Sequence, residues 1–92
     1  MKYHIQYSGR FKKSLKKAYK RGLDVEVLRG IISSLENSGV VDAKYRPHKL
    51  SGRYSGCWEC HVQPDWLLVW QQDDDKLILL LLDTGTHSDI FG

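Results

Sequence analysis

Three histidines lie in segments that also carry cationic or acidic side chains: His48, His61 and His87. Histidine can accept or donate a proton near neutral pH. Cleavage of RNA without a metal needs a base to take the proton of the ribose 2′-hydroxyl and an acid to protonate the departing 5′-oxygen. It also needs cations near the phosphate, where negative charge develops. The candidate cations, all close to His48 in the sequence, are Arg46, Lys49 and Arg53.

A histidine on a strand is more often structural than catalytic. These residue types therefore permit a ribonuclease but do not establish one by themselves. The elements that carry the three histidines must bring them together before the chemistry is possible.

Two aromatic residues are candidates for stacking on RNA bases, which is how proteins usually hold single-stranded RNA. Trp66 follows Asp65, and it could equally belong to the core. Phe91 belongs to the polar C-terminal segment that also contains His87. Because a large apolar side chain favours packing, we expect this segment to fold back over the sheet and not to fray.

The segment Cys57–His61 matches the C-x-x-C-H pattern of covalent haem attachment. In a strand, residues three apart face opposite sides, so the two sulfurs could not bind one haem or one zinc ion, and a disulfide between them is disfavoured. We therefore expect no cofactor, no metal and no disulfide here, and we expect Cys60 to be a small core residue. The opposite face of the strand would carry Glu59, His61 and Gln63.

Charge is divided unevenly along the chain. Residues 1–53 carry 13 of the 14 lysines and arginines against four acidic residues, for a net charge of +9. Residues 54–92 carry Lys76 against seven acidic residues, for a net charge of −6. This asymmetry fits either a solvated helix surface or a surface that binds phosphate or an acidic partner.

The first half of the chain predicts a strand followed by two helices. Residues 1–7 alternate as in a half-buried strand. Ser8 can cap a helix that stops at Gly22, and Asp24 can cap a second helix that closes at Gly39. The short link predicts an antiparallel helix hairpin. The residues expected to face the core are Phe11, Leu15, Ala18 and Tyr19 in the first helix and Val25, Leu28, Ile31, Ile32 and Leu35 in the second.

The second half predicts a long connection and three strands. Residues 40–56 have the composition of a loop, and a loop of this length is usually functional or mobile. Strands are expected at about 57–63, 66–72 and 77–83. The run Leu77–Leu82 has no alternation, which predicts a central strand covered on both faces.

At 92 residues the chain predicts one α+β domain with the order β-α-α-β-β-β, an antiparallel-rich sheet and the helix hairpin packed on one face. No apolar run reaches the length of a signal peptide or a bilayer span, so we expect a cytoplasmic protein without a membrane partner.

Three segments together resemble the YafQ branch of the RelE/ParE toxin superfamily: Tyr45–Gly52, Glu59–Trp66 and Thr84–Phe91. The opening Ile5–Ser8 followed by a lysine-rich helix is also similar, so the resemblance covers nearly the whole chain. The combination of H-x-L-x-G, H-V-x-P-D-W and T-G-T-H with a following Phe is specific.

The resemblance implies a RelE-like fold and a ribosome-dependent messenger RNA endonuclease that uses no metal. It further implies a cognate antitoxin that neutralises the toxin in a hetero-oligomeric complex. Family functional positions fall on His48, His61, Asp65, Trp66, His87 and Phe91. In this hypothesis His87 is the general acid and His48 or His61 is the general base. Asp65 would orient a histidine, and the lysine-rich helix could dock on the ribosome.

One position departs from the family pattern. The family commonly has an arginine immediately before T-G-T-H, where it stabilises the phosphate, and this chain has Asp83. A carboxylate facing the scissile phosphate would repel it. Either Arg46, Lys49 or Arg53 supplies the charge, or the chain is a weak or altered nuclease.

Two alternatives remain open at this point. The ParE branch shares the fold and acts on DNA gyrase, but it lacks the histidine set. A module that binds RNA without cleaving it is made more plausible by Asp83.

Overall fold

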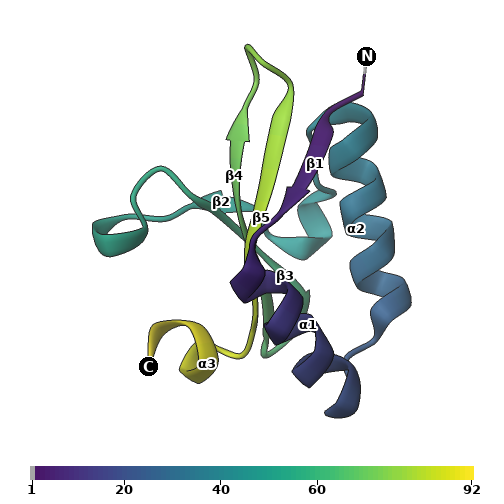
Figure 1. The fold of residues 1–92 in the computed structure, drawn as a ribbon, viewed down its shortest axis with the longest axis vertical. Helices are drawn as coiled ribbons and strands as arrows, with labels where there is room; N and C mark the ends of the chain where they lie inside the picture. Colours follow the sequence, from purple (N-terminus) through teal and green to yellow (C-terminus); the bar gives the residue numbers. More distant parts are fainter. Residues whose placement is uncertain (1) are drawn as a thin grey trace.

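The computed structural model describes residues 2–92, which form one five-stranded sheet with helices packed against it (Figure 1). The sheet order is β1-β5-β4-β3-β2, with β1 parallel to β5 and the other neighbours antiparallel. This confirms the predicted α+β fold. The strands are β1 (His4–Tyr7), β2 (His48–Lys49), β3 (Trp58–Gln63), β4 (Trp66–Asp73) and β5 (Ile78–Gly85). The helices are α1 (Gly9–Lys20), α2 (Val25–Ser38) and α3 (His87–Phe91), with short 3-10 helices η1 (Ala43–Tyr45) and η2 (Gly52–Tyr54).

Both predicted helices begin and end as their capping residues indicate. The Ser8 side chain accepts from the backbone N–H of Phe11, and Asp24 accepts from the first turn of α2. Gly39 ends α2 in the left-handed conformation, where a Cβ atom would collide with the ring of Tyr3. Most of the expected core face holds, but Tyr19 is 71% exposed, and Val27 packs against the core in place of the expected Val25.

The apolar run forms β5, an interior strand between β1 and β4, and its two faces are covered unequally. The middle strand of the sheet is β4, not β5 as the sequence predicted. Leu79 and Leu81 are fully buried on the side that faces α1 and α2. Leu80 and Leu82 on the other side are only half-buried, because little but α3 and the segment around η2 covers that side. The expectation of a strand covered on both faces was therefore wrong for the second face.

The C-terminal segment packs against a smaller apolar cluster on this second side of the sheet. Ile90 of α3 packs there with Cys57, Leu67 and Val69. The predicted fold-back of the segment is confirmed, and it takes the form of the short helix α3 (Figure 1). Within residues 2–92, no helix combines the length and apolarity needed to cross a membrane.

Candidate active site

Three histidines and a phenylalanine form a row on the side of the sheet that α3 partly covers. The ring centroids of His48 and His61 are 6.3 Å apart, and those of His61 and His87 are 6.1 Å apart. Phe91 continues the row at 6.1 Å from His87. The sequence separates these residues by up to 43 positions, and β2, β3 and α3 bring them together. The structure thus gathers all three predicted histidines.

His87 is the first residue of α3, and a reciprocal capping box fixes that helix. The Thr86 hydroxyl accepts from the Asp89 N–H, and the Asp89 carboxylate accepts from the Thr86 N–H. That Thr86 backbone bond, together with the Arg21 guanidinium, lowers the pKa of Asp89 below its usual range. The His87 Nδ1 atom lies 3.3 Å from the Asp65 carboxylate. Because a carboxylate accepts, Nδ1 carries a proton in this pair and Nε2 is left for another partner.

His48 is held between two acceptors. Its Nδ1 atom is 3.0 Å from the carbonyl oxygen of Arg46, and its Nε2 atom is 3.4 Å from the Glu59 carboxylate. A carbonyl oxygen can only accept, so Nδ1 donates. The two contacts together fix the orientation of the imidazole ring.

Glu59 is a residue of this site to which sequence reasoning gave no role. Its side chain is 4% exposed, and one carboxylate oxygen is buried without a partner among the described residues. The sequence signal was its place two residues before His61 on the same face. What the sequence could not show is that the register of β2 and β3 sets Glu59 opposite His48.

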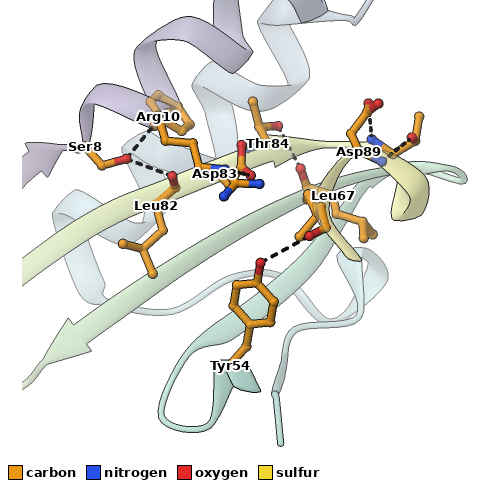
Figure 2. A network of polar contacts seen from close by, with 11 residues as sticks. Ser8, Arg10, Tyr54, Leu67, Leu82, Asp83, Thr84 and Asp89 are labelled. Carbon is orange, nitrogen blue, oxygen red and sulfur yellow. Dashed lines mark hydrogen bonds and ion pairs between the residues drawn. The ribbon is translucent and has the colours of Figure 1, made fainter. Parts of the chain in front are cut away.

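Tyr54 is a second residue that the sequence did not single out. Its hydroxyl donates to the Ile90 carbonyl of α3 (Figure 2). Its ring meets Phe91 edge-on at 5.3 Å between centroids. The Arg53 guanidinium lies 5.4 Å from the centre of the same Tyr54 ring. Phe91 is therefore held in place and still 38% exposed, so one part of its ring remains available for stacking.

The predicted cations divide between the two sides of the sheet. Arg46 lines a hollow of about 420 Å³ together with His61, and Arg53 lies beside the Tyr54–Phe91 pair. Lys49 instead lies over Trp58, 5.6 Å from its ring centre, and that ring packs against the helix-side core. The structure therefore does not bring Lys49 to the histidines.

Trp66 and Gln63 also turn away from the row of histidines. Trp66 packs against the helix-side core, and the Arg21 guanidinium lies 5.0 Å from its ring centre. The Gln63 side chain accepts from the backbone N–H of Asp24, and the register of β3 shifts between His61 and Gln63. Gln63 still lines the hollow of Arg46 and His61, but its amide oxygen is bound to Asp24.

Asp83 does not face the histidines as a free carboxylate. It is 5% exposed, and the Nε atom of Arg10 donates to it at 2.8 Å. Its other oxygen accepts from the Thr84 N–H (Figure 2). The sequence suggested that Asp83 would repel the scissile phosphate. This repulsion is reduced, because a guanidinium from α1 neutralises the carboxylate.

The two cysteines lie on opposite sides of the sheet and are free, as the strand geometry predicted. Burial raises the pKa of the Cys60 thiol to about 12, with the nearby Glu59 charge adding to the effect. Among residues 2–92, no group of three or more histidine, cysteine or acidic side chains is arranged to hold a metal ion.

Comparison with known proteins decides the family. Residues 3–92 match the model of the family described as the bacterial toxin of a type II toxin-antitoxin system, YafQ. The chain belongs to the YafQ toxin family. A curated relative, the mRNA interferase toxin YafQ of Escherichia coli K12, is 37% identical over 89 residues, which cover 96% of this chain and 95% of the relative.

Solved YafQ structures have the same fold. The E. coli DinJ–YafQ complex contains a chain that is 36% identical, with a TM-score of 0.88 and coverage of 98% of this chain and 99% of that one. An E. coli YafQ mutant with one histidine changed to glutamine is 35% identical, with a TM-score of 0.90 and coverage of 98% and 99%. The RelE-like fold and the family expected from the sequence motifs are both confirmed.

Proposed function

We propose that this YafQ-family toxin is a ribosome-dependent endonuclease of messenger RNA and that a cognate antitoxin neutralises it. The observation that carries the proposal is the row of three histidines with Asp65 on His87. The names of the relatives support it: one is an mRNA interferase, and another was solved in complex with DinJ, as a toxin–antitoxin pair. The histidine substituted in one E. coli structure corresponds to His87. A messenger RNA substrate also places the action in the cytoplasm.

The proposed reaction is a transesterification that needs no metal. The 2′-oxygen attacks the adjacent phosphorus as its proton passes to a base. The bond from phosphorus to the 5′-oxygen then breaks, and an acid protonates that oxygen. The products are a 2′,3′-cyclic phosphate and a 5′-hydroxyl. Proton transfers of this kind contribute about 10²–10⁴-fold each to such rates.

The geometry favours a particular assignment of these roles. Asp65 lies against the His87 ring and orients it, which suits the acid. His48 is fixed by the Arg46 carbonyl and by Glu59, so in this proposal it lies beside the phosphate. His61 lies between these two rings, which leaves it as the base in this proposal.

The remaining site residues bind the substrate in this proposal. Arg46 and Arg53 contact phosphates from the two ends of the row, and Phe91 stacks on a base with Tyr54 as its support. Asp83 no longer favours an RNA-binding module without cleavage, because Arg10 pairs with it.

The test is induced expression with and without the antitoxin gene, with the 5′ ends of cellular messenger RNA mapped. We expect cuts in translated regions that the antitoxin suppresses and that His87→Ala abolishes. The matched control is His4→Ala, which removes an exposed histidine from the opposite edge of the sheet. Growth arrest without cuts would point to another target, such as DNA gyrase, and full cleavage by His87→Ala would disprove the acid assignment.

A further inference from the structure

A cationic cleft of about 250 Å³ lies between α1 and the C-terminal end of β5. One wall is a row of four cations spaced three or four residues apart, so they share one face of α1. They are Arg10, Lys13, Lys17 and Arg21. The opposite wall contributes Asp83 and Asp89, so the lining carries a net charge of +2. Such a cleft attracts anions.

The pair of Arg10 and Asp83 fixes a guanidinium at this cleft. The Asp83 side chain is 7% exposed, whereas the Arg10 side chain is 62% exposed. A buried carboxylate is unfavourable unless it is paired and hydrogen-bonded, and Asp83 has both Arg10 and the Thr84 N–H. Within residues 2–92, the Arg10 side chain donates its hydrogen bond to Asp83 through Nε only. The terminal nitrogens of the fork can therefore still donate to another group.

The cleft adjoins a second hollow that reaches Asp65, the partner of His87. Arg21 and Trp66 line the cleft and also a second hollow of about 320 Å³. Asp65 and Thr86 line that second hollow, and Asp65 is the partner of His87. A strand of RNA that passes the histidines can therefore follow the edge of Trp66 into the cleft.

We propose that Arg10, positioned by Asp83, binds a backbone phosphate of the RNA next to the one that is cleaved. This inference rests on the proposed function for its RNA substrate. A fixed guanidinium one hollow away from a proton-transfer site suits a further phosphate of the same RNA strand. Arg10 is a substrate-binding residue in this proposal, and Asp83 is a positioning residue that acts through it.

The test measures binding separately from cleavage. The probe is a fluorescent octamer of single-stranded RNA with 2′-O-methyl groups, which lacks the attacking hydroxyl, and its Kd is measured over a range of salt concentrations. We expect Arg10→Gln to weaken binding about tenfold, as the loss of a charge-assisted hydrogen bond does. The slope of log K against log salt should shrink by about 0.7, the value for one phosphate contact on a single strand. The matched control is Arg29→Gln, which removes an exposed arginine paired with Glu26 on α2, outside the cleft.

Asp83→Asn separates positioning from simple attraction. This variant makes the cleft more positive. If the cleft attracts RNA only through its net charge, Asp83→Asn should bind RNA more tightly. Loss of the Arg10 anchor predicts weaker binding instead, with the shallower salt slope of Arg10→Gln. Thermal unfolding of each variant shows whether it is folded. If Asp83→Asn does not fold, the comparison of Arg10→Gln with Arg29→Gln decides alone.

Three outcomes would overturn the inference. The first is an unchanged Kd and salt slope for Arg10→Gln, and the second is tighter RNA binding by folded Asp83→Asn. The third is that Arg10→Gln and Asp83→Asn bind the antitoxin more weakly but bind RNA as the wild type does. Failure of the proposed function has a different signature. In that case the wild-type chain binds the octamer through Arg10 but makes no cuts in messenger RNA.

Discussion

At the scale of single residues, Glu59 is a side chain whose burial lowers the stability of the fold but serves the candidate active site. It is a carboxylate with 3% of its surface exposed, and one of its oxygens has no partner in the described part of the chain. Burying such a group is unfavourable, and a single contact with His48 compensates only part of it. The position makes sense if Glu59 keeps His48 oriented beside the phosphate.

Glu59→Gln tests this role. We expect kcat to fall about tenfold or more, the effect usually found for partners that orient a functional histidine. The melting temperature should change little, because the buried charge contributes little net stability. Glu59 acts through His48, so the same change made in a His48→Ala background should have no further effect on kcat. Additive losses in the double variant would show that Glu59 acts independently of His48.

Cys60 gives a residue-scale prediction about stability against pH. Its pKa is about 12 in the folded chain because the thiol is buried, whereas an unfolded cysteine has a pKa of about 8.5. A raised folded pKa means that the contribution to stability is complete below about pH 8.5 and is lost as pH rises toward 12. The free energy of unfolding, measured with urea, should therefore fall as pH rises from 8.5 to 10. The fall should be steeper in the wild type than in Cys60→Ala, by up to about 1.4 kcal/mol per pH unit. Parallel declines in the two proteins would contradict this.

At the scale of elements, α3 is the part of the site that depends most on local bonds. Five residues are too few for a stable isolated helix, so its capping box and the packing of Ile90 must hold it. Its first residue is His87 and its last is Phe91. The lowered pKa of Asp89 means that the cap is intact above about pH 4, the ordinary range for Asp, and is lost as pH falls through the lower folded value.

Asp89→Ala should therefore reduce cleavage more than it reduces global stability. We expect a loss of about 1 kcal/mol of unfolding free energy, typical of a lost helix cap. Because the loss falls on the helix that carries His87, kcat should decrease severalfold at neutral pH. Asp24→Ala is the matched control, since it removes the cap of α2 at similar cost but does not touch α3. Equal effects of the two variants on kcat would show that α3 needs no cap.

The elements themselves were largely predictable, because caps and hydrophobic spacing are local signals. Ser8, Asp24 and Gly39 marked the helices, and β3, β4 and β5 follow the expected strand ranges closely. The strand β2 was not predictable, since two residues have no periodicity and pair only because β3 is present. The turn of Gln63 away from His61 was missed for the same reason: a register shift depends on the partner strand.

The candidate site was predictable as a set of residue types and motifs, but not as an arrangement. His48, His61, Asp65, His87 and Phe91 do lie together. The side of the sheet on which each cation lies depends on pleat and register, and this excluded Lys49. The pairing of Arg10 with Asp83 joins positions 73 residues apart, so no local pattern could show it.

At the scale of the whole molecule, the uneven charge of the sequence becomes a cationic helix surface. Three lysines of α1 do not line the cleft and are exposed: Lys12, Lys16 and Lys20. They follow one another at intervals of four residues, where like charges repel and destabilise a helix by about 0.2–0.5 kcal/mol per pair. A row of this kind, which is unfavourable for the helix itself, fits an external polyanion such as ribosomal RNA.

Replacing all three lysines by glutamine tests this surface. We expect the variant to melt at the same temperature or slightly higher, because two repulsive pairs are removed from α1. Ribosome-dependent cleavage should nevertheless fall and become less sensitive to salt, because fewer counterions are exchanged when the toxin docks. Affinity for the free RNA octamer should stay within about twofold of the wild-type value, since these side chains lie outside the cleft. The lost charge should have only a weak long-range effect on it.

If cleavage on ribosomes were unchanged while the variant was more stable, the lysines would be only a solvated face. The ribosome would then have to be recognised elsewhere on the toxin.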